Sequence, residues 1–257
     1  MPGESSVAWK DLKGKSCLVT AASRTLGAEI ARVLARAGAA VAVNYQRNSK
    51  AAEALCAELR KYGADCFTVQ ADVSDPAEVA RMTETVWKRF KGLDLLVNCA
   101  GPYVDAPFLS LSVEDFDRIL ATNARSTFLV SAGFGRLMKK RGGGKIINIS
   151  ATSYLNRSHS IYGMAKACVV YLTEAMALEL APEVRVNAIA PDLLAENEEM
   201  DAEFARRAAA GTPLGRLVTR REVAEALLLL CTSPFDFCTG TTVVLDGGRS
   251  IPRLWMG

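Results

Sequence analysis

The residues best suited to proton transfer lie in the segment Tyr162-Gly-Met-Ala-Lys166. Residues four apart share one face of a helix, so the Lys166 ammonium would stand beside the Tyr162 phenol and favour its ionised form. A phenol with a pKa of about 10 is a poor acid–base catalyst at neutral pH, and a lowered pKa would make it useful. Tyrosine and lysine four apart are also common on solvated helix faces. Ser150 distinguishes this pair from such a solvated one, because it ends an apolar run that we expect to be a buried strand. The start of the next helix then brings Tyr162 back over the same end of that strand.

The elements that position these residues are strands and helices that alternate regularly along the chain. Short β-branched runs alternate with helical patterns along the chain, which is typical of a doubly wound parallel sheet. The runs lack strict polar–apolar alternation, and burial on both faces of the sheet explains that. We predict an α/β fold, a single-domain Rossmann-type sheet of about seven parallel strands with helices on both faces. The expected strands are 16–20, 40–45, 65–71, 93–98, 145–150, 184–190 and 242–245.

The expected helices carry their own start signals. Asp75, Ser112 and Thr219 each stand before an acidic third helical position, as capping residues do. We expect long helices over 112–140 and 161–180. The acidic segment around 192–213 has the pattern of a mobile substrate lid outside the sheet, although a solvated surface helix explains it equally well.

Length and composition indicate one domain over residues 1–257. With 50% hydrophobic residues the chain can bury a substantial core, and no Pro/Gly/Ser-rich linker divides it. The 31 lysines and arginines are scattered among 28 acids, so we expect no nucleic-acid partner. No apolar stretch approaches the roughly 20 residues of a membrane span, and residues 1–15 are polar. We therefore expect a cytoplasmic protein with no membrane association.

The metal-ligating and thiol residues are unremarkable in their spacing. Seven cysteines form no C-x-x-C pair and lie mostly within apolar segments. We expect buried thiols in a reducing cytoplasm, with no disulfide framework and no zinc site. His159 is the single histidine, so we expect no bound metal.

Polar clusters follow the expected strands at the edge where an open α/β sheet binds its ligand. They comprise the turn 20–27 after the first strand, Asp72-Val73 after the third, 98–101 after the fourth, Ser150 after the fifth and Pro191 after the sixth. One ligand lying across this edge would touch all of them.

These motifs, in this order, resemble the classical short-chain dehydrogenases/reductases over residues 15–248, with pteridine reductases and 3-oxoacyl carrier protein reductases as the nearest types. The resemblance implies that Tyr162 protonates the substrate oxygen while hydride arrives from a nicotinamide. It implies that Lys166 holds the nicotinamide ribose and lowers the tyrosine pKa. Ser150 would hydrogen-bond the carbonyl group, and Asn123 would hold a water in a proton relay. The matching residues are 20–27, 72–73, 98–101, Asn123, Ser150, Tyr162, Lys166, 185–191, 239–240 and 244–248.

The cofactor expected from the resemblance is NADPH. An NAD enzyme needs an acid after the second strand, whereas 43–48 contains Arg47 and no acid, with Arg24 in the nearby turn. A solvated surface arginine would also explain Arg47, but not the missing acid. The expected cofactor-binding residues are Thr20, Ser23, Arg24, Leu26, Gly27, Asn44, Tyr45, Arg47, Asn48, Asp72, Val73, Asn98, Ala100, Gly101, Tyr162, Lys166, Pro191 and Leu194.

Several residues depart from the family pattern. The usual turn T-G-x-x-x-G-x-G reads T-A-A-S-R-T-L-G here, and a methyl group at Ala21 requires a negative φ or strain. A modified working turn and a vestigial one both stay open. Asp192 replaces a common glycine and Glu196 a common threonine. Ser150 lies twelve residues before Tyr162, one fewer than usual, so Ser153 is the reserve candidate for the active serine.

The function predicted from these residues is NADPH-dependent reduction of a carbonyl group or a pterin-like C=N bond. The alternatives are redox-neutral chemistry on the same fold, such as dehydration, cyclisation or isomerisation, and a non-catalytic nucleotide-binding protein. Helices 112–140 and 161–180 carry surplus apolar surface, and related proteins pair there, so we expect a homotetramer or dimer. The expected substrate-pocket residues, each of which loop packing also explains, are Tyr103, Ser150, Tyr154, His159 and Leu194, with Met200 beside them.

Overall fold

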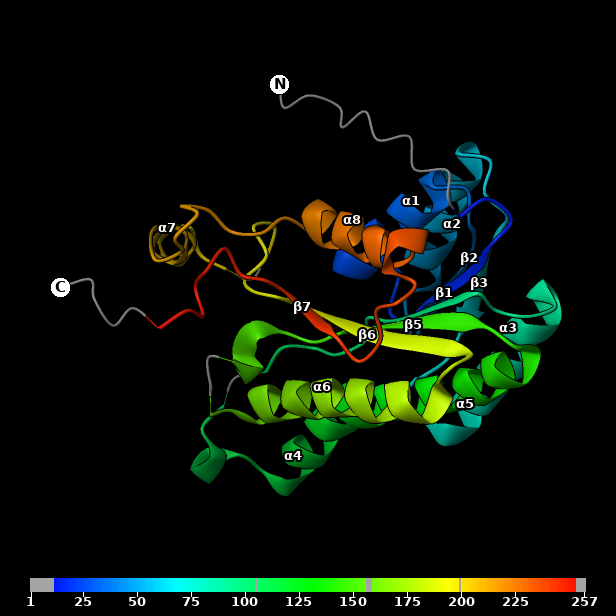
Figure 1. The fold of residues 1–257 in the computed structure, drawn as a ribbon. Coiled ribbons are helices and arrows are strands. Elements are labelled where there is room, and N and C mark those ends of the chain that lie inside the picture. The colour runs from blue at the N-terminus through cyan, green and yellow to red at the C-terminus, as the bar shows by residue number, and fades with distance from the viewer. Residues whose placement is uncertain (1–11, 105, 156–158, 199, 253–257) are drawn as a thin grey trace.

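A seven-stranded parallel sheet forms the centre of the molecule (Figure 1). The computed structural model describes residues 12–104, 106–155, 159–198 and 200–252. The strand order β3-β2-β1-β4-β5-β6-β7 runs outward in both directions from β1 and β4, which confirms the doubly wound, Rossmann-type prediction. The strands are β1 (Ser16–Val19), β2 (Ala40–Tyr45), β3 (Cys66–Gln70), β4 (Leu95–Asn98), β5 (Gly144–Ile149), β6 (Val184–Pro191) and β7 (Thr242–Leu245).

Helices cover both faces of this sheet. Figure 1 shows α1, α2 and α8 on one face, with α3, α5 and α6 on the other. The helices are α1 (Thr25–Arg36), α2 (Ser49–Lys61), α3 (Pro76–Phe90), α4 (Val113–Leu120), α5 (Ser126–Arg141), α6 (Ile161–Leu180), α7 (Ala202–Ala210) and α8 (Arg220–Leu230). Short turns of other helix types are η1 (Phe108–Ser110), η2 (Ala121–Arg125), η3 (Thr152–Tyr154) and η4 (Ser233–Phe235).

Two apolar layers account for the sequence pattern of the strands. In β1, Cys17 and Val19 pack under α1 and α8, whereas Leu18 packs under α3 and α5. All four β1 residues are buried, because the sheet has a helical layer on each face. The missing polar–apolar alternation therefore has the cause predicted from the sequence.

The predicted capping residues begin their helices as expected. Asp75 accepts a hydrogen bond from the backbone N–H of Glu78, and Ser112 accepts one from Asp115. Thr219 and Glu222 form a complete capping box at the start of α8. These caps fix where the chain leaves each loop and enters the helical layer.

The long helix predicted over 112–140 is confirmed in extent, because α4, η2 and α5 follow one another without a break. The prediction missed the π-helical turn η2 within it. The hydroxyls of Thr122, Ser126 and Thr127 donate to carbonyl oxygens one turn earlier, each at 2.8 Å, and such bonds compete with the regular helix ladder. The wider turn displaces Asn123 from a regular helical position, and π-helical turns are frequent at functional sites.

The prediction of free thiols is wrong for two cysteines. Cys56 on α2 and Cys66 on β3 form a disulfide, with their Cα atoms 5.5 Å apart. A separation of ten residues matches no common sequence motif, and only helix–strand packing brings the pair within disulfide reach. The other five cysteines are free, and burial raises the pKa of Cys99 to about 11 and that of Cys231 to about 12.

One helix of the described chain, α6, is long and apolar enough to cross a membrane by length and composition. This finding differs from the prediction that no stretch reaches that length. In the structure α6 packs along the sheet, with Ile161, Ala165 and Val169 buried. Its apolar residues are divided between the core and an exposed face that contains Met164, Tyr171 and Leu178.

Candidate active site at the carboxyl ends of the strands

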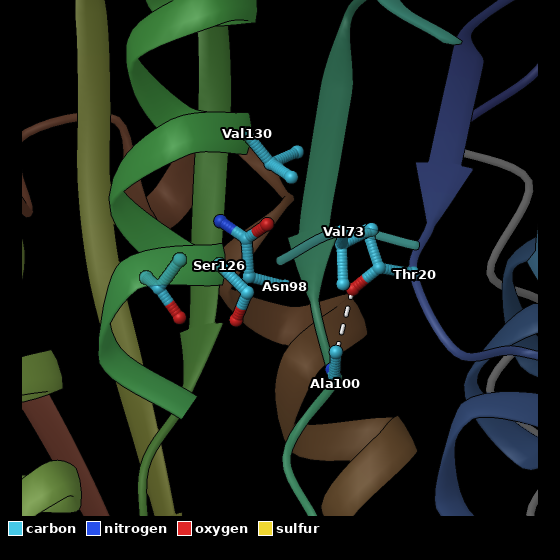
Figure 2. Close-up of a pocket in the computed structure, with 7 residues that line it drawn as sticks. Thr20, Val73, Asn98, Ala100, Ser126 and Val130 are labelled. Atoms are coloured by element: carbon cyan, nitrogen blue, oxygen red, sulfur yellow. Dashed lines mark hydrogen bonds between the residues drawn. The ribbon is translucent and has the colours of Figure 1, made fainter. Parts of the chain in front are cut away.

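Four predicted cofactor residues surround one small closed gap between the ends of β1 and β4 and helix α5, which has no room for a water molecule. Figure 2 shows Thr20, Val73, Asn98 and Ala100 around this gap, with Ser126 and Val130 of α5. It lies at the β1/β4 reversal of strand order, where doubly wound sheets bind nucleotides. The Thr20 hydroxyl accepts hydrogen bonds from the backbone N–H of Cys99 at 2.9 Å and of Ala100 at 3.3 Å. Thr20 thus links the first turn to the loop after β4.

Sequence analysis missed the α5 side of this gap. Ser126 and Thr127 line it, and both donate to the carbonyl oxygen of Asn123. The sequence signal for this side was the presence of hydroxyl residues on the buried face of a helix that is otherwise apolar there, since buried faces are usually lined by apolar side chains.

The turn after β1 keeps its shape without two of the family's glycines. Ala21 and Thr25 both have φ of 50°, in the left-handed region that favours glycine. A Cβ on Gly27 would lie 2.7 Å from the Ala21 carbonyl oxygen, so this glycine is required for close packing. Asn44 supports the turn, because its Oδ1 accepts from Ala21 N at 3.0 Å and its backbone oxygen accepts from Ala22 N at 2.8 Å.

The N-terminus of α1 is free to bind an anion. Arg24 occupies the capping position without a side-chain cap, and no acidic residue lies in the first turn. By contrast, side chains cap α2, α3, α4, α6, α7 and α8. Uncapped amides together with the helix dipole suit a phosphate group, and Arg24 adds a positive charge there. These features fit the pyrophosphate of a dinucleotide.

The end of β2 presents a cation and no acid. Arg47 is exposed there, and the neighbouring carboxylate of Asp72 accepts hydrogen bonds from Gln46 and Ser74. Burial acts to raise the pKa of Asp72, but the bonds from Ser74 and Gln46 hold it below its usual value. The exposed positive charge fits a 2′-phosphate better than a 2′-hydroxyl.

Three asparagines predicted to bind the cofactor have structural partners. Asn44 holds the first turn, and Asn48 caps α2 by accepting from Ala51 N at 3.0 Å. The Asn98 amide donates to Ser131 at 2.7 Å and to Asn148 at 2.8 Å in the core. These side chains hold the edge of the sheet in shape.

The remaining cofactor residues flank this edge. Leu26 and Gly27 are buried at the start of α1, Ser23 and Tyr45 are half-buried, and Pro191 is buried at the end of β6. Leu194 forms an isolated bridge with Val218.

The predicted catalytic residues converge from three elements. Lys166 Nζ lies 5.4 Å from the ring centre of Tyr162 and donates to the carbonyl oxygen of Ile149 at 3.1 Å. Asn123 is fully buried and donates to the Ile119 carbonyl at 3.1 Å, while its Oδ1 has no hydrogen-bond partner among the described residues. A Cβ on Gly101 would collide with that Oδ1 and approach Lys166 Nζ to 3.1 Å. Only glycine allows the loop after β4 to approach both side chains.

Burial controls the ionisation of the central pair. Desolvation raises the pKa of Tyr162 well above its ordinary value, and Tyr103 and Cys99 add to the effect. Desolvation also lowers the pKa of Lys166 to about 8. This differs from the expectation that the lysine lowers the tyrosine pKa. The cause is the shared burial, which disfavours the charged form of both groups.

Residues after β5, β6 and β7 form a connected polar group. The Ser150 hydroxyl donates to the Lys166 carbonyl oxygen at 2.9 Å, and the Thr152 hydroxyl donates to Asp192 at 2.7 Å. Asp192 also forms an ion pair with Arg249 at 3.3 Å. The aspartate that replaces the family's glycine therefore joins three strand ends.

The predicted substrate loops differ in their relation to Tyr162. Tyr103 lies edge-on to it, with ring centres 5.0 Å apart, and the Tyr103 residue is 61% exposed. Tyr154 lies in η3, where burial raises its pKa. His159 is exposed with a positive φ, and Met200 is half-buried within segment 192–213. Among the described residues, Tyr103 is the one aromatic side chain in ring contact with Tyr162.

The segment 192–213, predicted to be a lid or a surface helix, is anchored at its beginning. Ala195 N donates to the Val218 carbonyl at 2.8 Å, and the Glu196 carboxylate accepts from Arg220 N at 3.0 Å. Helix α7 lies beyond this anchor and outside the sheet layers (Figure 1). Glu196, which replaces a common threonine, is thus bound to the N-terminus of α8.

Known proteins resemble this chain over nearly its whole length. A family model described as Enoyl-(Acyl carrier protein) reductase matches residues 20–250. A 3-oxoacyl-[acyl-carrier-protein] reductase of Synechocystis sp. is 36% identical over 243 residues, which cover 92% of this chain and 97% of the relative. A 7α-hydroxysteroid dehydrogenase complexed with NADH and 7-oxo glycochenodeoxycholic acid has a TM-score of 0.88 at 29% identity, covering 95% of this chain and 98% of its own. A Burkholderia cenocepacia gluconate 5-dehydrogenase in complex with NADP and tartrate has a TM-score of 0.88 at 30% identity, covering the same shares.

The first prediction concerns the strained turn. Ala21→Gly should raise the free energy of unfolding by about 1 kcal/mol, because it removes a Cβ from a left-handed backbone position. Urea unfolding measures the change. Ala22→Gly is the matched control and should lower stability, because Ala22 is fully buried. A loss of stability in Ala21→Gly would contradict the described turn.

The second prediction concerns the buried lysine. Because the native pKa of about 8 lies below the usual lysine value of about 10.5, the unfolded chain binds more protons between these two pH values. Stability of the wild type relative to Lys166→Met should therefore rise with pH across that window, by about 3 kcal/mol at most. Urea unfolding of both proteins from about pH 7 to about pH 10.5 measures the difference. A flat or falling difference would show that the ammonium is not buried.

Proposed function

Because the chain belongs to the short-chain dehydrogenase/reductase family of oxidoreductases, we propose that it uses NADPH to reduce a carbonyl group or a pterin-like C=N bond. The observation that carries the proposal is the convergence of Tyr162, Lys166 and Asn123 beside Gly101. This group lies at the same sheet edge as the uncapped N-terminus of α1. The substrate and the cofactor phosphates would therefore share one edge of the sheet.

The preference for NADPH is supported by charge. Arg47 is exposed at the end of β2 and Arg24 at the start of α1, on the expected path of an adenosine ribose phosphate. Structural relatives are complexed with NADH in one case and with NADP in another, so the fold accommodates either cofactor. The missing acid after β2 favours the phosphorylated form.

The chain's own residues would hold the cofactor and move one proton. When bound, the nicotinamide supplies the hydride. Lys166 would hold the ribose, and the uncapped amides of α1 would hold the pyrophosphate. Tyr162 has a raised pKa, so its phenol stays protonated at neutral pH and can donate its proton to the substrate oxygen. The Asn123 Oδ1, which has no partner in the part of the chain that the structure describes, would accept from a water that returns a proton to this pair.

Two other functions, redox-neutral chemistry and non-catalytic nucleotide binding, can be compared with reduction on the residues of the site. Redox-neutral chemistry would use the same phenol, and the altered turn with Asp192 motivates it. A non-catalytic nucleotide-binding protein would have no need of a buried lysine beside a buried phenol. The reductase relatives favour reduction over both.

The third prediction tests the cofactor and the acid together. Titration with NADPH and NADH, followed by nicotinamide fluorescence, should show tighter NADPH binding. Arg47→Ala should weaken NADPH binding by about tenfold and leave NADH binding nearly unchanged, because it removes the phosphate partner. Tyr162→Phe should keep NADPH binding and lose turnover by about 100-fold or more. The substrate panel is acetoacetyl-coenzyme A, cyclohexanone and dihydrobiopterin.

Controls separate the possible failures. Lys50→Ala, which removes a neighbouring exposed cation, should leave the preference for NADPH intact. If neither cofactor binds, the altered turn is a lesion and the reductase proposal falls. If NADPH binds but no panel member is reduced, the redox-neutral alternative takes its place.

We also propose that the protein is a cytoplasmic homo-oligomer, a dimer or a tetramer, with no nucleic-acid or membrane partner. On α6, Met164, Tyr171 and Leu178 are exposed at intervals of seven residues, which puts them on one face of the helix. Phe128 on the neighbouring α5 is also exposed. Exposed apolar side chains in a row of this kind mark an interaction surface.

The fourth prediction addresses this apolar row. Tyr171→Glu combined with Leu178→Glu should reduce the molecular mass measured by light scattering to that of a monomer, because it places charges in the interface. Leu109→Glu, at a fully exposed leucine in η1, is the control and should leave the mass unchanged. An unchanged mass in the double variant would exclude this surface, and a monomeric wild type would exclude the oligomer.

A further inference from the structure

We propose that Ser153, held in place by the chain of contacts Thr152–Asp192–Arg249, supplies the hydroxyl that hydrogen-bonds the substrate oxygen. The inference rests on the proposed function, because it assigns a role in that reduction. It transfers the expected role of Ser150 to a residue three positions later. Asp192 becomes a positioning residue in this scheme.

The segment Ser150-Ala-Thr-Ser153 contains three hydroxyls, and two of them are occupied. Ser150 is 2% exposed and donates its only hydroxyl proton to the Lys166 carbonyl oxygen at 2.9 Å. Thr152 is also 2% exposed and donates to Asp192 at 2.7 Å. Neither hydroxyl is free to donate to a substrate without breaking a buried bond.

The third hydroxyl of the segment belongs to Ser153. Ser153 Oγ is buried and has no hydrogen-bond partner among the described residues. A buried hydroxyl without a partner is unfavourable in a folded protein, so its persistence points to a partner that arrives later. A carbonyl oxygen accepts hydrogen bonds, and Ser153 would donate to it. The turn η3, which contains Ser153, packs against α6, the helix of Tyr162.

The position of Ser153 is restrained through its preceding neighbour. Its neighbour Thr152 is bound to Asp192 at the end of β6, and Asp192 is paired with Arg249 after β7. The Asp192 side chain is only 13% exposed, so this bond and ion pair are protected from water.

The far end of this chain of contacts is itself rigid. Asp246 accepts hydrogen bonds from Gly248 N at 2.9 Å and from Ser250 N at 2.7 Å, which closes a tight turn around Arg249. A Cβ on Gly247 would lie 2.6 Å from the Thr212 side chain, so the turn also packs closely against the end of segment 192–213. The ends of β5, β6 and β7 are therefore held together, and Ser153 lies in the turn that follows β5.

The donor is tested by comparing two alanine variants. With the panel member that the wild type reduces fastest, Ser153→Ala should lower kcat by about 100-fold, the loss typical of one donor to a developing oxyanion. Its NADPH dissociation constant and melting temperature should stay near those of the wild type. Ser150→Ala should mainly lower the melting temperature, with a smaller loss of kcat. A larger loss of kcat in Ser150→Ala than in Ser153→Ala would overturn the assignment.

The positioning role is tested at Thr152. Thr152→Val keeps the shape of the side chain and removes its bond to Asp192, so it should lower kcat by about tenfold with little change in the KM for NADPH. Thr152→Ser keeps the hydroxyl and should restore kcat. If Thr152→Val lowers the melting temperature but keeps the wild-type kcat, the contact is merely structural and the positioning role is excluded.

The two proposals fail in different ways. A wild-type protein that reduces no panel member overturns the proposed function and this inference with it. Wild-type turnover that Ser153→Ala leaves intact overturns this inference alone.

Discussion

The close approach of the Gly101 backbone to Asn123 and Lys166 is the constraint on which the site depends. With any Cβ at this position, the loop after β4 would have to move away from Asn123 Oδ1 and Lys166 Nζ. The π-helical turn brings Asn123 in from one side, and α6 brings Lys166 and Tyr162 from the other. The loop after β4, the turn η2 and helix α6 thus meet at a point where position 101 has room for a hydrogen atom but for no side chain.

The polar groups at this edge divide into those that shape it and those that remain for chemistry. Asn44, Asn98 and Ser150 are all bonded to protein atoms, and they hold turns and strand ends in register. Asn123 Oδ1 and Ser153 Oγ are buried without partners among the described residues. Thr83, Glu183 and Arg220 also carry buried atoms without partners among the described residues, but Asn123 and Ser153 are the two that lie in turns packed against α6, the helix of Tyr162 and Lys166.

The sequence predicts the fold well because burial on two faces leaves a clear pattern, as in Ile146-Ile-Asn-Ile149, and because capping acids such as Asp75 mark helix starts. It also predicts that Tyr162, Lys166 and Asn123 belong together. It does not predict which asparagine side chains already have hydrogen-bond partners in the protein. Nothing in the sequence around Asn44 or Asn98 distinguishes an amide that is bonded from one that is free to bind a ligand. Nor does it predict the direction of the Tyr162 pKa, since that depends on how deeply the lysine and phenol are buried together. The π-helical turn within 112–140 and the Cys56–Cys66 disulfide likewise arise from packing.

The support that Asn44 gives to the first turn changes what that turn depends on. Where glycine occupies the left-handed position, the backbone adopts its conformation unaided, and the second strand is free to vary. Here alanine holds that conformation at φ 50° while Asn44 bonds the turn on one side and the carbonyls of Val69 and Ala71 on the other. The conformation of the first turn therefore depends on a residue of the second strand. A substitution of Asn44 would remove the side-chain bonds that hold Ala21 in the left-handed region.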